Sequence, residues 1–552
     1  MNFFKGFKDN LIPTILFAFM ISVFGPMEVY LSNKGYFFFP GTDMLGMIMV
    51  VFALIITISF GVLGVSQVIG DVFYKVIYGM FIGGIIGLYI QGNWDITDYG
   101  AWNGSDIEWT DFRVQFIGFA LMWIVLFILC VFLSCKKYDI FKKASQYICG
   151  FILLILLYTL IVLLVRNSGL GKDEEYIATT DHELQLSSSQ NMIILVVDTF
   201  DGTAFNDIIT NNPEYSDIFG GFTFYRDTMS AYTSTDMSIP MIMTGNDYRN
   251  DITYGEYLCS SYSDSELMQW LSENEWGIGV YTDMLVPQNN DELGIENLHK
   301  LLRVSSDRVT LMRYMYDIIL FRYLPQPLKR YFTFYPDNLK TELCTFASSD
   351  YNVYTEDNLL FEDAVKYISA KRPEGVFQLI HIDGSHPPFY YTSDLVLSDN
   401  ETSYEEECEG IIKLINQFIA GLKDKGVYDN TVILIMGDHG YYNSRQNPLL
   451  LVKATNETHA LEISEKPVSF YDLQDAYLKL LEGKSDSRSV FDDVAVEGRT
   501  RTIRSVPWNT HLNHDTYGGL MKEYATDKTA YDPNGLGFDG NEYAPVDNGG
   551  LR

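Results

Sequence analysis

Asp438 and His439 stand side by side between Gly437 and Gly440, directly after the apolar stretch Thr431–Met436. Such a stretch is typical of a buried strand. An adjacent Asp and His offer one oxygen and one nitrogen ligand, a pair suited to zinc or manganese. The alternative is an ordinary turn with a solvent-exposed Asp. Flanking glycines permit a tight turn under either interpretation.

A second acidic residue, Asp198, follows another apolar stretch at residues 192–197. A carboxylate at the end of a buried strand is a candidate metal ligand, but it also often caps the next helix. Asp201 lies in the same turn and competes for the ligand role.

Hydroxyl side chains crowd residues 232–240, which read Tyr-Thr-Ser-Thr-Asp-Met-Ser-Ile-Pro. Thr235 is the candidate nucleophile. A hydroxyl at a helix start has backbone N–H groups and the positive end of the helix dipole beside it. This setting and a bound metal both favour the alkoxide. The alternative is an ordinary helix N-cap, a position that Thr and Ser favour.

Two of the eight histidines, His381 and His386, fall in one loop after a predicted strand. Either could protonate a leaving oxygen or bind a phosphoryl or sulfuryl oxygen. The alternative is a structural histidine that caps the turn.

The elements around these residues alternate between strands and helices, which predicts a mostly parallel sheet covered on both faces. Ligands of such sheets bind at the carboxyl ends of the strands, where the candidate residues cluster. Strands are predicted at 192–197, 278–281, 376–381, 431–436 and 449–452, and helices at 264–272, 356–370, 404–425 and 466–481.

The first 165 residues have a different character, with five apolar stretches long enough to span a bilayer, which needs about 20 residues. A cleaved signal peptide does not explain the first, because no small-residue cleavage site precedes a soluble domain. The predicted spans lie at about 11–31, 44–63, 72–90, 114–134 and 147–165.

The distribution of lysines predicts on which side of the membrane the ends of these spans lie. Lys5 and Lys8 precede the first span, and four lysines fill the loop at 136–143 between the fourth and fifth. With five spans, both sites share one side of the membrane. We therefore expect a multi-pass cell-membrane protein with a cytoplasmic N-terminus and an extracytoplasmic catalytic domain.

Composition excludes nucleic acid as a partner, because a formal net charge of -32 leaves no clustered basic surface for phosphates. The predicted organisation is a transmembrane domain at 1–165, a linker at 166–190, a catalytic domain at 191–485 and a loop-rich C-terminal extension at 486–552.

Taken in chain order, these motifs resemble the sulfatase / alkaline phosphatase superfamily. Thr235 to Pro240, followed by Met243-Thr244-Gly245, resembles the nucleophile loop of its membrane-bound transferases. Residues 376–388 resemble the segment that ends in a substrate-contacting His, and residues 426–440 resemble the strand and metal-binding Asp-His-Gly. The resemblance covers about residues 190–485, and the five-span layout is similar to that of lipoteichoic acid synthases and phosphoethanolamine transferases.

The resemblance implies a sulfatase-like α/β domain with one divalent metal, zinc or manganese. Asp198, Thr235, Asp438 and His439 would bind the metal. Thr235 would be the nucleophile and His386 a catalytic residue that contacts the substrate, with His381 and Ser238 as further possible substrate contacts.

Two departures from the family pattern reduce the range of reactions and substrates that the resemblance implies. Sulfatases that use formylglycine need Cys or Ser in a C/S-x-P-S-R stretch, but here Pro240 is followed by Met241 and Ile242. Phosphoethanolamine transferases of the periplasm carry several disulfides, but only three cysteines lie outside the apolar half of this chain.

We therefore expect a transferase that moves a phospholipid head group, phosphoglycerol-like or phosphoethanolamine-like, through a phosphothreonine intermediate. Its partners would be a membrane phospholipid donor and a cell-envelope glycan, lipid or protein acceptor. The first alternative is a hydrolase of sulfuric or phosphoric esters. The second is a non-catalytic membrane protein that retains the fold.

Overall fold

The computed structural model forms two compact units, Met1–Glu174 with Leu302–Ala347, and Glu175–Leu301 with Ser348–Arg552. Residues 302–347, predicted from the sequence as part of the catalytic domain, thus belong to the first unit. The described residues are 3–34, 37, 39–95, 97, 99, 107, 109–167, 174–301, 303–305, 307–332, 344–346, 351–441, 446–505, 514, 517–532 and 536–544.

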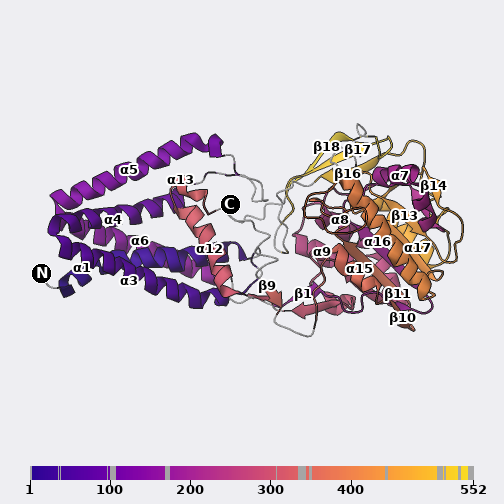
Figure 1. Cartoon of the computed structure of the whole chain (residues 1–552), viewed down its shortest axis with the longest axis horizontal. Helices are drawn as coiled ribbons and strands as arrows, with labels where there is room; N and C mark the ends of the chain where they lie inside the picture. Colours follow the sequence, from indigo (N-terminus) through magenta and orange to yellow (C-terminus); the bar gives the residue numbers. More distant parts are fainter. Residues whose placement is uncertain are drawn as a thin grey trace. The chain divides into compact units, whose positions relative to one another are not determined.

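The first unit contains the five predicted apolar spans as helices, which Figure 1 draws in indigo and purple. The first span is composite, with α1 at Phe3–Ala18, the π-helix η1 at Phe19–Phe24 and α2 at Gly25–Ser32. The others are α3 (Leu45–Ile69), α4 (Asp71–Trp94), α5 (Arg113–Lys136) and α6 (Tyr138–Arg166). Each is long and apolar enough to cross a membrane.

A sixth long helix of this unit, α12 (Arg308–Tyr323), comes from the inserted segment. Leu311, Met315 and Ile319 are spaced four residues apart and pack in one core with the apolar helices. The segment also contains α13 (Gln326–Lys329) and strands β8 (Arg303–Ser305) and β9 (Cys344–Phe346). Because α12 is too polar to be a span, the sequence pattern did not associate it with the membrane half.

The second unit is built on a seven-stranded sheet in the order β14-β4-β13-β12-β3-β11-β6. The three central strands are β3 (Asn191–Val197), β11 (Val376–Ile382) and β12 (Thr431–Met436). They run parallel in register and are completely buried, which explains their continuous apolar sequence. The outer strands are β6 (Gly277–Tyr281), β13 (Leu450–Lys453), β4 (Thr223–Tyr225) and β14 (Glu462–Ser464).

The fold class predicted from the sequence is confirmed, with one antiparallel strand, β13, inside a mostly parallel sheet. The principal helices form two groups whose members contact one another. One group comprises α7 (Gly202–Asn211), α15 (Asn358–Val365) and α16 (Tyr404–Asp424). The other comprises α8 (Thr235–Thr244), α9 (Tyr254–Ser263), α10 (Glu266–Glu273) and α17 (Leu473–Leu481).

Two predicted helices are shorter in the structure. The helix predicted at 356–370 ends at Val365, and Ser369–Arg372 form strand β10 beside β2 (Gln185–Ser187). The helix predicted at 466–481 begins only at Leu473, because Val468–Ser469 pair as β15 with β5 (Thr228–Met229). In each case, pairing with a neighbouring strand outweighed the helix propensity of the residues at that end of the predicted helix.

The C-terminal region is more regular than the predicted loop-rich extension. It contains a three-stranded antiparallel sheet of β16 (Arg501–Ser505), β17 (Met521–Thr526) and β18 (Gly537–Tyr543). The buried residues of β16 include Arg501 and Arg504, so the strand lacks an apolar pattern. In the predicted linker, residues 168–173 lie outside the described residues, while β1 (Glu175–Ala178) pairs with β7 (Leu298–Leu301).

Candidate active site

Three adjacent parallel strands end at the same edge of the central sheet and deliver the predicted site residues there. Asp198 follows β3, Asp438 and His439 follow β12, and His381 lies near the end of β11. Because β3 pairs with both neighbours in register, these side chains converge from segments far apart in the sequence. This is the edge at which parallel α/β sheets bind ligands.

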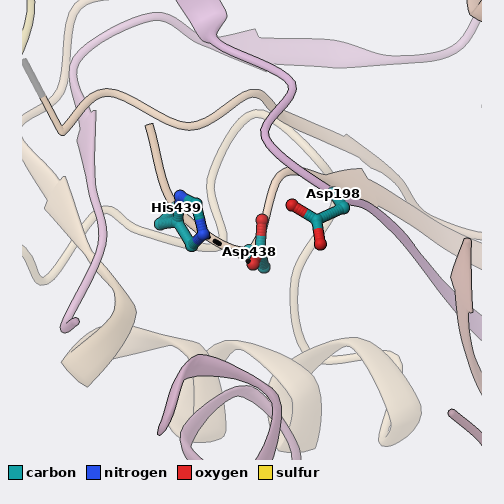
Figure 2. A group of neighbouring side chains, drawn as sticks. All are labelled: Asp198, Asp438 and His439. Atoms are coloured by element: carbon teal, nitrogen blue, oxygen red, sulfur yellow. Dashed lines mark ion pairs between the residues drawn. The ribbon is translucent and has the colours of Figure 1, made fainter. Parts of the chain in front are cut away.

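Asp198, Asp438 and His439 form a cluster whose ligand atoms all lie within 4.8 Å of one another. Figure 2 shows the two carboxylates and the imidazole facing one another, with the ion pair between His439 and Asp438. In that pair His439 Nε2 lies 3.2 Å from Asp438 Oδ2. Two carboxylates and one imidazole are a donor set for zinc or manganese.

The residue after Asp198 holds the cluster in place from an uncommon backbone conformation. Thr199 has a φ of 58°, a left-handed value that is an outlier for a β-branched residue. Its N–H donates to Asp438 Oδ1 at 2.9 Å, and its hydroxyl donates to Asp198 Oδ1 at 2.5 Å. Thr199 therefore positions both carboxylates, and such strain persists only where surrounding contacts support it.

Glycines are required at two points of this edge by close backbone approach. A Cβ on Gly437 would lie 2.5 Å from Phe200 O, and a Cβ on Gly384 would lie 2.7 Å from Asp198 N. Both distances are shorter than any normal contact. The turn after β12 and the turn after β11 can therefore reach the end of β3 only with glycine at these positions.

Thr235 joins the cluster from the first residue of helix α8. Its hydroxyl lies 3.2 Å from Asp198 Oδ2 and 3.5 Å from His439 Nε2. Ser234, not Thr235, occupies the N-cap position, and no side chain caps the helix. The Thr235 hydroxyl therefore faces the Asp/His cluster at the N-terminal end of α8, where the helix dipole favours negative charge.

The charges of the cluster are strongly interdependent. Burial raises the pKa of the Asp198 carboxyl, but His381, His439 and His386 together hold it below its ordinary value. The pKa of Asp438 is raised by burial and by the charge of Asp198. Burial lowers the pKa of His439, yet the two carboxylates beside it raise the pKa above its usual value.

The residues present fit a bound divalent cation. Asp438 is fully buried, and its Oδ2 accepts no hydrogen bond among the described residues, so that its ion pair with His439 is the contact that remains. Two neighbouring buried carboxylates repel each other unless positive charge lies between them. Asp198, Asp438, His439 and the Thr235 oxygen would hold that cation.

The structure also resolves two alternatives left open by the sequence. Asp201 caps helix α7 by accepting from Thr203 N at 2.7 Å, so it serves the helix rather than the cluster. Among the described residues, the Asp198 carboxylate instead accepts from the hydroxyls of Thr199 and Thr235.

The remaining predicted residues lie at differing depths. His386 is exposed in the loop after β11, and its charge acts on Asp198. His381 is completely buried, with Nε2 3.5 Å from Asp198 Oδ2. Ser238 is also completely buried, inside α8. Roles for these three in substrate contact stay predictions.

Reasoning from the sequence missed a structural support for the Thr235 loop. Arg504 of β16 is almost fully buried and donates to Asp247 Oδ2 at 2.6 Å and to Glu523 Oε2 at 3.0 Å. Its backbone N–H donates to Ala231 O and its carbonyl accepts from Thr233 N, just before Thr235. The only sequence signal was two arginines in a short β-like stretch.

Comparisons with known proteins give a family match for most of the second unit. A family model described as Sulfatase matches residues 190–462. A comparison with curated proteins finds no match.

Similar solved structures include three with low sequence identity. Ps i-CgsB in complex with k-i-k-neocarrahexaose is 15% identical, with a TM-score of 0.41, covering 61% of this chain and 82% of that chain. The phosphonate monoester hydrolase SpPMH from Silicibacter pomeroyi is 12% identical, with a TM-score of 0.34, covering 63% and 88%. A protein in the alkaline phosphatase superfamily from Vibrio parahaemolyticus is 10% identical, with a TM-score of 0.36, covering 67% and 81%.

Proposed function

Because residues 190–462 match the sulfatase family, which supports ester hydrolase or transferase activity, we propose a specific reaction for this protein. It is a membrane-anchored, metal-dependent transferase that moves a phospholipid head group to an acceptor in the cell envelope. One observation carries the proposal. The Thr235 hydroxyl lies at the start of α8, within 3.5 Å of both Asp198 and His439.

In the first step the Thr235 oxygen attacks the phosphorus of the donor phospholipid. The bond between phosphorus and the diacylglycerol oxygen breaks, and that oxygen takes up a proton as diacylglycerol leaves. The Thr235 hydroxyl releases its own proton to solvent, and the proton donor of the leaving oxygen regains one from solvent, so that protons balance over the step. His386, exposed beside the site, is the proton donor in this proposal. The head group remains on Thr235 as a phosphothreonine diester.

In the second step a hydroxyl of the acceptor attacks the same phosphorus. The bond between phosphorus and the Thr235 oxygen breaks, and the Thr235 oxygen takes up the proton that the acceptor loses. The positive end of the α8 dipole stabilises negative charge on the transferred group in both steps. A divalent cation held by Asp198, Asp438, His439 and Thr235 would lower the pKa of the Thr235 hydroxyl and offset that charge.

Two features favour a phospholipid as donor. The five apolar helices anchor the enzyme where phospholipids are. The loop at Thr235 has Met241 and Ile242 after Pro240, which does not match the stretch that formylglycine chemistry needs. A hydroxyl nucleophile in the encoded sequence suits phosphoryl transfer without prior modification.

The test uses full-length protein in detergent and phospholipids with a fluorescent acyl chain. Wild-type protein should release fluorescent diacylglycerol, and Thr235→Ala should reduce the release to background while the midpoint of thermal unfolding is preserved. Thr233→Ala is the matched control, since Thr233 lies in the same loop outside the cluster, and it should retain activity. Turnover by Thr235→Ala at the wild-type rate would overturn the proposal.

A second candidate function is hydrolysis of sulfuric or phosphoric esters, with water as the acceptor. The observation in its favour is the family model itself, which is described as Sulfatase. Release of free sulfate or phosphate from simple esters, without any added acceptor, would favour hydrolysis over transfer.

A further inference from the structure

A second cluster of ligand-type side chains lies at the same edge of the sheet. It comprises Asp283, Glu356 and His381, whose ligand atoms all lie within 4.8 Å of one another. Asp283 follows strand β6, and His381 lies near the end of β11, which pairs with β6. Glu356 precedes helix α15. None of the three is a member of the cluster around Asp438.

Among the described residues, the carboxylates of this second cluster have no cationic partner other than His381. Asp283 Oδ1 and Glu356 Oε2 are buried atoms that have no hydrogen-bond partner among the described residues. Within the same part of the chain, no Lys or Arg pairs with either residue, and the only ion pair of Glu356 is with His381. Two carboxylates that approach each other through buried oxygen atoms require a proton or a cation between them.

The orientation of His381 points to a cation. Its imidazole is completely buried, and Nδ1 lies 3.1 Å from Glu356 Oε2, so this nitrogen faces the second cluster. The other nitrogen, Nε2, lies 3.5 Å from Asp198 Oδ2. A histidine that ligates a metal through one nitrogen usually directs the other N–H at a carboxylate, and His381 has this arrangement.

We propose that Asp283, Glu356 and His381 bind a second divalent cation, next to the predicted site at Asp198, Asp438 and His439. One imidazole nitrogen and two carboxylates suit Zn²⁺ or Mn²⁺. His381 ligates through Nδ1, and its Nε2–H faces Asp198 of the first site. The two cations are therefore connected through one imidazole and one carboxylate.

This second site accounts for the concentration of negative charge at the sheet edge. Asp198, Asp438, Asp283 and Glu356 contribute four carboxylates there, and among the described residues their ion pairs are with histidines only. One divalent cation leaves the pair behind His381 uncompensated, whereas two neutralise all four. The inference does not depend on the transferase reaction, since it would hold for a hydrolase as well.

The experiment counts metal ions on the full-length protein in detergent. Chelated protein is re-equilibrated with Mn²⁺ or Zn²⁺, desalted and measured by elemental mass spectrometry. Wild-type protein should hold two ions per chain, and the double variant Asp283→Asn with Glu356→Gln should hold one. Glu362→Gln, a nearby carboxylate on α15 that bonds only to Gln417 among the described residues, is the matched control and should hold two.

A variant of the first site tests the second site separately, because the number of bound ions is measured without any enzymatic activity. His439→Ala should retain one ion, and Glu356→Gln added to it should remove that ion. One ion per wild-type chain, or two in the double variant, would overturn the proposal and leave His381 as an imidazolium between two carboxylates. If the double variant fails to fold, anomalous scattering from Mn²⁺ in wild-type crystals provides the test. We expect an anomalous peak between Asp283 and His381, and the absence of that peak would contradict the proposal.

Discussion

Thr199 donates hydrogen bonds to both carboxylates of the first cluster, one from its N–H and one from its hydroxyl. Valine has nearly the same side-chain shape without the hydroxyl. Thr199→Val keeps the branched side chain but loses the 2.5 Å hydrogen bond to Asp198 Oδ1. We expect turnover to fall about tenfold, because a ligand carboxylate that is free to rotate disturbs the reacting geometry. Kinetics on fluorescent phospholipid measure the fall.

The control for this variant is Thr223→Val on strand β4. Thr223 is equally buried and also loses one hydroxyl contact, to Ser487 Oγ at 2.9 Å. Each variant should lower the free energy of unfolding by about 1 kcal/mol. An equal loss of turnover in both would show that Thr199 acts only through stability.

At this scale the sequence was most informative for residues that directly follow a buried strand. Asp198, Asp438 and His439 each follow continuous apolar residues, and the structure brings all three together with Thr235. Asp283 and Glu356 were missed because neither belongs to a motif, and their proximity depends on the pairing of β6 with β11. Arg504 was missed because its partners lie far away in the sequence.

At the scale of elements, strand β16 supports the segment that leads into helix α8, which begins at Thr235. Residues Tyr232 and Arg504 pair across a parallel bridge, and the Arg504 guanidinium joins Asp247 to Glu523. We regard Arg504 as a positioning residue, since it touches neither Thr235 nor the Asp/His cluster in the described contacts.

Arg504→Lys tests this role while preserving the positive charge. Lysine cannot bridge two carboxylates with the fork geometry of arginine. We expect turnover to fall several-fold at unchanged KM, together with a lower midpoint of thermal unfolding, and the bound metal to stay at the wild-type amount. Arg226→Lys, which alters a more exposed pair with Glu465, should change none of these. Unchanged turnover by Arg504→Lys would reduce the arginine to a purely structural role.

The predicted bounds of helices and strands agree best with the structure where the hydrophobic pattern is long and uniform. Strands β3, β11 and β12 and helix α16 lie close to their predicted bounds. The ends of α15 and α17 differ because short strands replace one helix end in each, and such pairing cannot be recognised locally. Strand β13 was predicted, but its antiparallel direction was not. That direction depends on which strands pair with β13, and the local sequence does not specify the pairing.

For the whole molecule, five apolar helices and a sulfatase-family domain were both foreseeable from the sequence. The insertion of residues 302–347 into the membrane unit was not, because α12 carries an apolar stripe without an apolar run. The distribution of lysines still leads us to propose that the catalytic domain is extracytoplasmic.

Cysteine labelling tests this orientation in intact cells. In a chain whose accessible cysteines are replaced by serine, Lys484→Cys in the catalytic unit and Lys137→Cys between α5 and α6 each provide one exposed thiol. A membrane-impermeant maleimide should label Lys484→Cys in intact cells and Lys137→Cys only after permeabilisation. The reverse pattern would invert the proposed topology.

The central claim is that Thr235 carries the transferred group, and mass spectrometry of Thr235 tests it most directly. Full-length protein would be incubated with one phospholipid at a time in the absence of acceptor and then digested. We predict that the peptide containing Thr235 gains the mass of one phosphorylated head group, and that Thr235→Ala shows no gain. Turnover of the same phospholipid with the Thr235 peptide unmodified, or with the adduct on another residue, would contradict the account.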